Sequence, residues 1–249
     1  MRAIRPWSSR RSEFGVVQPG APIAENRAAT GILDWRADWI EEVLGLAGVE
    51  PGAIDIASVQ SLHGAIATHV RGVYAFDETQ PTSVTWTRRR GSCSQRLAIL
   101  ESAARAIGVA TCVRGVWVDG RFWYPRFPKL RFAIPDRVLL AWPAFHLGGT
   151  WVSASELFGT IDALAKANPS GFTNAGESLF DALVATAIDW DGDTASSASC
   201  AACNLSAEVV VDLGYFNSRD QLFAANGQTL CAPVRVVIEP LFSRRAART

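Results

Sequence analysis

Hydrophobic and polar positions repeat along the chain with two periods, which predict an α+β fold of helices packed on an antiparallel sheet. The clearest helical pattern begins at Cys93, with Leu97, Leu100 and Ala104 on one face and Gly108 at its end. Residues 74–87 are expected to form a loop with a short strand. Helices are expected at 30–46, 58–70, 93–107, 156–167, 177–188, 205–213 and 219–225.

Two pairs of turn residues predict antiparallel hairpins after the Cys93 helix. Asp119-Gly120 and Gly148-Gly149 are each flanked by apolar runs, as is typical of two-residue hairpin turns. Strands are expected at 110–118, 121–127, 137–147, 150–154 and 234–238. The chain is therefore predicted to comprise an aperiodic arm at 1–28, an α+β core at 29–158 and a mostly helical extension at 159–249.

Composition and charge exclude several classes of function. Hydrophobic residues make up 49% of the chain, which is enough to form a sizeable core, so wholesale disorder is excluded. Lys plus Arg and Asp plus Glu both number 24, and this balance predicts no nucleic-acid partner and no membrane partner. The longest apolar runs are too short to span a bilayer, and none of signal-peptide length follows the basic N-terminus. We therefore expect a cytoplasmic protein.

Five cysteines in 249 residues do not form a disulfide framework; in a reducing compartment they are free thiols, metal ligands or catalytic groups. Cys200, Cys203 and the distant Cys231 provide three thiols, whereas a structural zinc site needs four ligands, normally as two close pairs. Residues 189–193 begin like a calcium loop but lack its glycine and its final acidic ligand. No metal and no cofactor is therefore expected, with zinc or a redox pair as the alternatives for Cys200 and Cys203.

Cys93 is the candidate reactive thiol. It stands at the start of the predicted helix, where unpaired backbone N–H groups and the helix dipole stabilise both a thiolate and an oxyanion. The arginines at 88–90 and at 96 would strengthen this effect if they lie near the sulfur. The alternative is a packed core cysteine, which is the interpretation that we favour for Cys112 within its strand.

Four segments around this cysteine carry a family resemblance. Gly91-Ser92-Cys93 opens the helix, Ala106–Thr111 forms the turn after it, and Leu140–Phe145 and Trp151-Val152 occupy two later strands. These segments resemble four motifs of the transglutaminase-like, papain-like cysteine superfamily. The first two resemble its Gly-x-Cys helix start and the turn that leads into its sheet. The last two resemble its His-Ala-Trp-x-Glu-x strand and its Trp-Val-x-x-Asp strand. The resemblance covers roughly residues 60–156. It implies a Cys-bearing helix packed on an antiparallel sheet, and acyl-transfer chemistry.

The chain departs from the family at two of its three catalytic positions. Leu140 stands at the position of the family's histidine, and Ser155 stands at that of its aspartate. His146 lies roughly 20 Å further along the strand, at about 3.3 Å per residue, which is too far for it to replace that histidine directly. His63 and His69 are six residues apart on one predicted helix, so at most one of them faces inward.

The first predicted hairpin, residues 110–127, supplies candidate partners for the thiol and a candidate acyl pocket. Asp119 and Tyr124 are the candidate acid–base residues, although a turn role explains the first and hairpin packing explains the second. Aromatic residues crowd this hairpin, where they either line an apolar pocket or fill the core. The candidate substrate-binding residues are Phe122, Trp123, Trp142 and Gln95.

The resemblance leads to one hypothesis of function and two alternatives. The hypothesis is a cysteine-dependent acyl transferase or cyclase acting on a thioester, either small or bound to a carrier protein, in bacterial natural-product biosynthesis. A thioester suits a site without the usual histidine, because its thiolate leaves readily; Dieckmann-type cyclisation and amide formation both fit. The alternatives are a catalytically inactive binding or scaffold protein, and a cysteine peptidase or amidase with a rebuilt triad.

Overall fold

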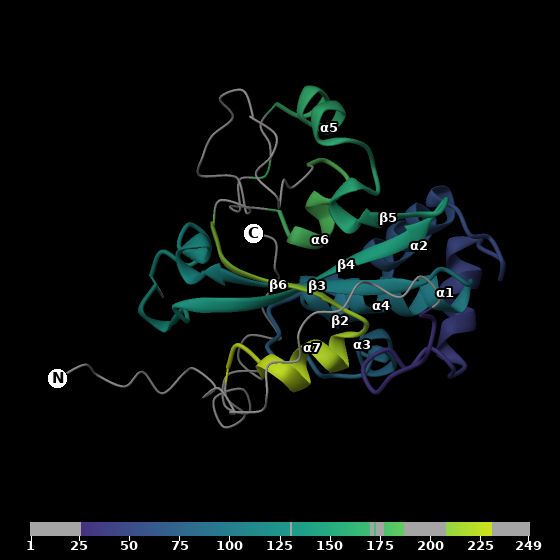
Figure 1. Ribbon diagram of the computed structural model, residues 1–249, viewed down its shortest axis with the longest axis horizontal. Helices are drawn as coiled ribbons and strands as arrows, with labels where there is room; N and C mark the ends of the chain where they lie inside the picture. The colour runs from purple at the N-terminus through teal and green to yellow at the C-terminus, as the bar shows by residue number, and fades with distance from the viewer. Residues whose placement is uncertain (1–25, 130, 170–171, 173–176, 187–207, 231–249) are drawn as a thin grey trace.

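The computed structural model describes residues 26–129, 131–169, 172, 177–186 and 208–230, which build helices around an antiparallel sheet (Figure 1). This arrangement confirms the expected α+β class. The sheet has the order β5-β4-β3-β6, and two short strands, β1 and β2, pair in parallel elsewhere. The strands are β1 (Arg71–Gly72), β2 (Arg90–Gly91), β3 (Thr111–Asp119), β4 (Arg137–Leu147), β5 (Thr150–Ser153) and β6 (Val209–Phe216).

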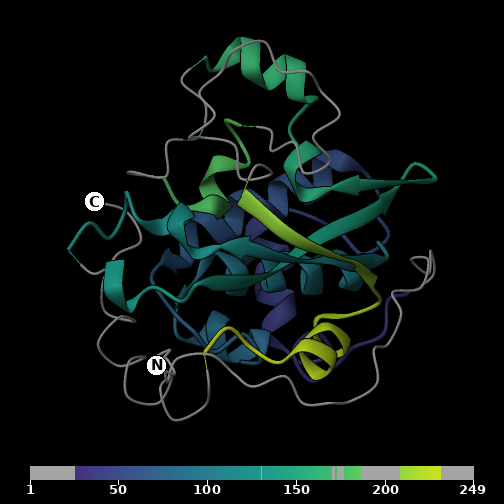
Figure 2. The same cartoon turned by 60° about the vertical axis from the view of Figure 1, so that its left-hand side comes forward.

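Helices cover the sheet from more than one side. Helix α4 packs on β3 and β4 and is covered in turn by α1, α2 and α3, whereas α7 packs on β3 and β6. Helix α5 lies at the periphery in both views (Figures 1 and 2). The helices and 3-10 turns are α1 (Trp39–Ala47), α2 (Ile56–His69), α3 (Thr82–Thr87), α4 (Cys93–Ala106), η1 (Gly120–Trp123), η2 (Arg131–Ala133), η3 (Ala154–Glu156), α5 (Ile161–Ala167), α6 (Leu179–Ala182) and α7 (Arg219–Asn226).

The second predicted hairpin is confirmed and the first is wrong. Strands β4 and β5 pair across Gly148-Gly149, but β3 pairs with β4 rather than with residues 121–127. The Asp119 side chain caps η1 instead and turns the chain out of the sheet. The backbone N–H of Gly120 donates to the Asp136 carbonyl at 2.9 Å, which closes a loop over residues 120–136. A helix-capping carboxylate and a long-range hydrogen bond therefore replace the two-residue turn.

The predicted helix at 205–213 is also wrong, because residues 209–216 form strand β6 against the open edge of β3. Three consecutive β-branched residues, Val209–Val211, favour the extended conformation that the partner strand then fixes. Gly115 allows the following helix to approach β3, because a Cβ there would lie 2.5 Å from Leu222 Cδ1. The segment predicted as a helical extension thus contributes a strand to the central sheet.

Several helix boundaries differ from the expectation. The first helix starts only at Trp39, residues 74–87 contain α3, and the helix expected at 156–167 is divided into η3 and α5 around Gly159. Helix α6 ends at Ala182. The helices expected at 58–70, 93–107 and 219–225 are confirmed as α2, α4 and α7 within two residues at their starts. The strand expected at 234–238 and residues 1–25 of the predicted arm lie outside the described residues.

Helix α4 is the centre of the core, and it carries charge as well as apolar side chains. Leu100 is fully buried, and so is Glu101, whose carboxylate accepts a 2.6 Å hydrogen bond from Arg219 of α7. Arg105 is also buried and donates to the hydroxyl and the carbonyl of Thr111 on β3. These contacts fix α4 relative to the sheet and to α7. Among the described helices, none has both the length and the apolar character needed to cross a membrane.

Candidate functional site

Cys93 is the first helical residue of α4, and local sequence fixes it there. The Ser92 hydroxyl accepts from the Gln95 N–H at 3.1 Å, and the Gln95 side chain accepts from the Ser92 N–H at 3.0 Å, which is a complete capping box. A Cβ on Gly91 would lie 2.6 Å from Thr85 Cγ2, so only glycine fits before the cap. The predicted helix start is therefore confirmed, and Gln95 serves the cap instead of lining a cavity.

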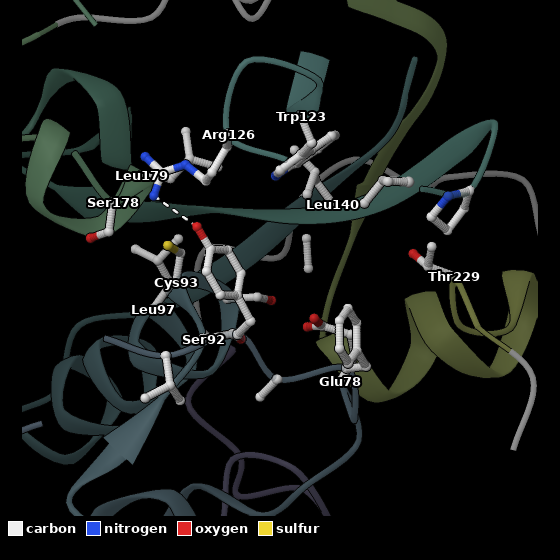
Figure 3. A pocket seen from close by; sticks show the side chains of 18 of the residues that line it. Glu78, Ser92, Cys93, Leu97, Trp123, Arg126, Leu140, Ser178, Leu179 and Thr229 are labelled. Atoms are coloured by element: carbon white, nitrogen blue, oxygen red, sulfur yellow. Dashed lines mark hydrogen bonds between the residues drawn. The ribbon is translucent and has the colours of Figure 1, made fainter. Parts of the chain in front are cut away.

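The half-buried Cys93 thiol opens onto a cavity of about 230 Å³. Figure 3 shows the sulfur and the Glu78 carboxylate entering this cavity from different segments, with Trp123 and Leu140 forming part of its wall. The lining is predominantly apolar. It consists of Val73, Tyr74, Ala75, Phe76, Glu78, Ser92, Cys93, Ser94, Leu97, Trp123, Arg126, Phe127, Ile134, Pro135, Val138, Leu140, Ala141, Trp142, Glu177, Ser178, Leu179, Thr229 and Leu230.

Strand β4 carries Leu140, the first of the two positions at which the resemblance expects catalytic partners, whereas the second, Ser155, lies in η3. Leu140, Ala141 and Trp142 all line the cavity. Trp142 Nε1 donates to the Ser153 hydroxyl at 3.0 Å, and that hydroxyl lies 3.0 Å from the buried Ser155 hydroxyl. Where the resemblance expects a histidine and an aspartate, this chain has an aliphatic side chain that lines the cavity and a buried hydroxyl that is linked through Ser153 to Trp142.

A hydrogen-bonded arginine spans one side of the cavity. Arg126 Nη1 donates to the Tyr74 hydroxyl at 3.0 Å, and Arg126 Nη2 donates to the Glu177 carbonyl (Figure 3). These bonds join the 120–136 loop to the segment after β1 and to the segment before α6. Burial raises the pKa of the Tyr74 phenol, the hydrogen bond and charge of Arg126 oppose that rise, and a Cys93 thiolate would add to it. Tyr74 is therefore a neutral hydroxyl at physiological pH.

Glu78 is held in the cavity wall through its backbone. Its N–H donates to the Gln228 side chain at 2.9 Å, and the preceding carbonyl, of Asp77, accepts from the Gln95 side chain at 2.9 Å. Because Gln95 belongs to the capping box of α4, the same residue that fixes the start of the Cys93 helix also fixes the segment that carries Glu78. The relative positions of the thiol and this carboxylate are thus coupled.

Two backbone donors at the start of α4 are available for an oxyanion. The capping box uses the N–H groups of Ser92 and Gln95, and the N–H of Arg96 donates to the Ser92 carbonyl at 2.9 Å. Within the described part of the chain, no hydrogen bond occupies the N–H of Cys93 or of Ser94. Both residues line the cavity, so the geometry is compatible with stabilising negative charge beside the sulfur.

The structure brings together only some of the predicted site residues. Cys93, Trp123 and Trp142 line the cavity. Phe122 is buried and stacks on Phe172, so it belongs to the core. The remaining candidates, Asp119, Tyr124 and Gln95, are not among the lining residues.

The two predicted acid–base partners have other contacts. Asp119 forms an ion pair of 2.7 Å with Arg121, and this hydrogen bond lowers the pKa of the carboxyl. The guanidinium of Arg131 lies over the ring of Tyr124, with 5.5 Å to the ring centroid. Neither residue is therefore placed to exchange a proton with Cys93.

The neighbouring arginines also have structural contacts instead of facing the thiol. Arg96 is buried, lies over the Phe180 ring and forms a 3.4 Å ion pair with Asp181. Arg89 pairs with Glu42 of α1. The expected support of these two arginines for a thiolate is therefore not part of the site, although Arg126, which sequence analysis did not select, lines the cavity.

None of the three histidines, all within the described residues, lines the cavity. His63 is buried, stacks on Phe180 and donates through Nε2 to the Phe180 carbonyl at 2.8 Å; burial lowers its pKa. His69 donates to the Ala65 carbonyl at 2.9 Å. His146 packs beside Trp151. The thiol therefore has no imidazole partner in the cavity.

The other thiols differ from Cys93 or lie outside the description. Cys112 is buried in β3, and burial raises the pKa of its thiol to about 12, so it is a core residue as expected. Cys200, Cys203, Cys231 and the acidic stretch 189–193 lie outside the described residues. In the part of the chain that is described, no three His, Cys, Asp or Glu side chains come together as a metal site.

Sequence reasoning missed Tyr74, Glu78 and Arg126 as cavity residues. Each comes from a segment without regular secondary structure, and their hydrogen-bond partners are distant in the chain: Arg126 for Tyr74, and Gln228 for Glu78. No family model, curated protein or solved structure matches this chain.

Proposed function

We propose that the protein is a cysteine-dependent acyl transferase whose Cys93 takes an acyl group from a thioester. The observation that carries this proposal is the combination of a partly exposed thiol at a capped helix N-terminus with an apolar cavity in front of it. An apolar cavity suits an acyl chain, and the N–H groups of Cys93 and Ser94 suit the oxyanion. The volume of about 230 Å³ lies below the roughly 300–1,000 Å³ of drug-sized ligand sites, which favours a short chain.

The first step is an exchange between two thioesters. The Cys93 sulfur attacks the carbonyl carbon, an S–C bond forms, and the bond to the donor sulfur breaks. The donor leaves as a thiol that carries the proton lost by Cys93, so the products are acyl-Cys93 and free donor thiol. A carbon or nitrogen nucleophile then takes the acyl group, which regenerates the Cys93 thiol and corresponds to cyclisation or amide formation.

The absence of histidine from the cavity favours a thioester over an amide. An amine leaving group must be protonated as it departs, which in cysteine hydrolases is done by a histidine, whereas a thiolate leaves without that help. Leu140 occupies the cavity where such a histidine would be needed. For this reason we do not propose a peptidase.

The proposal includes a transglutaminase-like core. It is supported by the order of the elements: a Gly-Ser-Cys start of α4, α4 packed on β3 and β4, and the β4–β5 hairpin after them. It is supported further by Leu140, which stands at the family's histidine position and lines the same cavity as Cys93. The acyl-transfer assignment rests on this correspondence as well as on the cavity.

The test is acylation of the thiol by a hexanoyl thioester of pantetheine, followed by intact mass and peptide mapping. We expect one hexanoyl group on wild type, mapped to Cys93, and none at that position in Cys93→Ser. Cys112→Ala is the matched control, since its buried thiol should not react. Absence of an adduct from wild type, or a Cys93→Ser protein that reacts to the same extent, would refute the proposal.

A second candidate function is a binding protein that has kept the fold and lost the chemistry. The specific observation in its favour is the replacement of both family partners, by Leu140 in the cavity and by the buried Ser155. This candidate predicts that hexanoyl-pantetheine binds with equal affinity to wild type and Cys93→Ser without forming an adduct. Calorimetry and intact mass on the same samples distinguish the two functions.

A further inference from the structure

The two short parallel strands that lead to the cavity place two arginines side by side. Arg71 on β1 is paired in register with Arg90 on β2, and Gly72 with Gly91. The ladder continues toward the cavity, since the Val73 N–H donates to the Gly91 carbonyl at 3.0 Å. Two guanidinium-bearing residues are thus neighbours across the strand pair, and each precedes a cavity segment.

Each of these arginines stands two residues before a residue of the cavity wall. Residues two apart along an extended chain share a face, which relates Arg71 to Val73, and Arg90 stands two residues before Ser92, the N-cap of α4. Val73 and Ser92 both line the cavity. The opposite face is occupied, because a Cβ on Gly91 would meet Thr85 and Gln95. At about 3.3 Å per residue, the arginine pair lies roughly 7 Å along the strands from the cavity-lining residues.

The charge of this pair is not neutralised within the described part of the chain. Neighbouring Arg88 donates to Gln80 and Arg89 pairs with Glu42, but no hydrogen bond or ion pair joins the side chain of Arg71 or of Arg90 to another described residue. Like charges directly opposite each other in a sheet are unfavourable. The strands follow the C-terminal ends of α2 and α3, whose partial negative charge makes the arrangement tolerable.

We propose that Arg71 and Arg90 bind the phosphate of a phosphopantetheine thioester, which is the acyl donor for Cys93. This inference rests on the proposed function and names the class of its substrate. Two planar guanidinium groups can each donate paired hydrogen bonds to phosphate oxygens, which makes arginine pairs suited to phosphate. The pantetheine arm then runs along the strand face past Val73 and Ser92 and delivers its thioester to the sulfur.

The phosphate has two natural sources that share this chemistry. Coenzyme A carries it next to an adenosine bisphosphate, and an acyl carrier protein carries it as a phosphodiester on a serine. The minimal probe that contains the shared part and nothing else is hexanoyl-phosphopantetheine, with hexanoyl-pantetheine as its counterpart without the phosphate. Whichever source the site uses is therefore expected to depend on Arg71 and Arg90, and each is tested as a separate donor.

The experiment measures the rate of Cys93 acylation by intact mass at donor concentrations below saturation. We expect hexanoyl-phosphopantetheine to acylate wild type about tenfold faster than hexanoyl-pantetheine, equivalent to about 1.4 kcal/mol. Arg71→Gln/Arg90→Gln should remove this difference and leave the rate with hexanoyl-pantetheine unchanged. Arg36→Gln/Lys166→Gln is the control, because it removes two positive charges from exposed residues elsewhere in the chain.

The outcomes separate this inference from the proposed function. If hexanoyl-pantetheine acylates Cys93 but the phosphate brings no gain, the arginine site is refuted and the acyl transferase stands. If neither thioester reacts, the proposed function fails, and calorimetry of phosphopantetheine with wild type and the double variant tests the site independently of reaction. Binding that is lost in the double variant supports the site; equal binding overturns it.

Hexanoyl-CoA and a hexanoyl carrier protein are then tested as separate donors. The double variant should slow acylation by whichever donor the site uses, and an unchanged rate with both overturns the inference.

Discussion

Substitution of Arg219 by methionine tests the buried ion pair that joins α7 to α4. Arg219 and Glu101 are both fully buried, with 2.6 Å between Nε and Oε1. The same guanidinium donates to the Ser94 hydroxyl at 2.8 Å and to the Ala141 carbonyl at 3.3 Å, two residues of the cavity wall. Arg219→Met therefore leaves a carboxyl without its counter-ion and two acceptors without a donor.

The magnitude follows from the protonation that Glu101 must undergo. Burial already raises its pKa, and Arg219 opposes that rise. Protonation of the carboxyl in the folded variant, from the ordinary value of 4.5, costs about 5 kcal/mol at pH 8 and about 1 kcal/mol at pH 5, and the deficit relative to wild type is smaller because the raised pKa of wild type already includes part of this cost. The first figure agrees with the roughly 3–5 kcal/mol found when one partner of a buried pair is removed.

The sign of the pH dependence is fixed by the same argument. A folded-state pKa above that of the unfolded chain gives stability that is present at low pH and is lost as the pH rises through the folded value. Loss of Arg219 raises the folded value further. The deficit of Arg219→Met relative to wild type should thus be larger at pH 8 than at pH 5.

Urea unfolding followed by circular dichroism at both pH values measures this deficit. Glu101→Leu/Arg219→Met should recover most of the loss, since an apolar pair can replace a buried ion pair. Arg114→Met is the matched control: its 2.6 Å pair with Asp212 is partly exposed, and such pairs contribute about 0–1 kcal/mol. The reasoning is refuted if Arg219→Met is no less stable than Arg114→Met, or if the double variant is no more stable than the single one.

Three further predictions concern the cavity and its surroundings. Leu140→His/Ser155→Asp should speed hydrolysis of hexanoyl-pantetheine by about 10²-fold, the usual gain from general base catalysis, and only while Cys93 is present. The measurement is the rate of thiol release. An unchanged rate contradicts the assignment of Leu140 and Ser155 to the family's histidine and aspartate positions. Arg126→Met removes the hydrogen bonds from Arg126 to the Tyr74 hydroxyl and the Glu177 carbonyl, and should lower the free energy of unfolding by about 1.5–3 kcal/mol. It should also raise the rate at which iodoacetamide alkylates Cys93. An equal effect of Lys129→Met, at an exposed residue, argues against this. Burial lowers the pKa of His63, so below the ordinary histidine pKa of about 6.5 the unfolded chain binds the proton first, and wild type loses up to about 1.4 kcal/mol of stability per pH unit. His63→Gln should flatten this pH dependence of the free energy of unfolding. If urea unfolding from pH 7 to pH 5 gives the same pH dependence for both proteins, the prediction is contradicted.

The parts of the fold that sequence predicted correctly are those encoded by neighbouring residues. The start of α4 depends on Ser92 and Gln95, three residues apart, and the β4–β5 hairpin depends on Gly148-Gly149 with positive φ at both. Each signal lies within a few residues of the structure that it specifies. The start of α4, with Cys93 as its first residue, could therefore be predicted from the sequence.

The parts that were missed depend on distant partners. Asp119-Gly120 has the composition of a hairpin turn, but Gly120 donates to Asp136, and that bond sends the chain into a loop. Val209–Val211 becomes a strand because β3 has an open edge, although β3 lies about ninety residues earlier in the chain. The cavity residues Tyr74 and Arg126 meet across 52 residues. No local pattern carries such pairings.

The buried charges of α4 bear on whether Cys93 is a functional thiol or a packed one. Glu101 pairs with Arg219, and Arg96 pairs with Asp181, so both residues of α4 bind segments from the C-terminal half of the chain. Burial of these pairs has a desolvation cost that apolar residues would not incur. Buried pairs of this kind contribute little to stability, but they fix the position of a helix because each accepts only one partner geometry. A cysteine that merely fills space needs no such fixation, since apolar packing tolerates small shifts. A thiol that must meet a carbonyl carbon and two backbone donors needs it, because displacements of about 1 Å can slow a reaction by about 10²-fold. Loss of Cys93 acylation in a folded Glu101→Leu/Arg219→Met protein would therefore show that these charges are retained to position the sulfur.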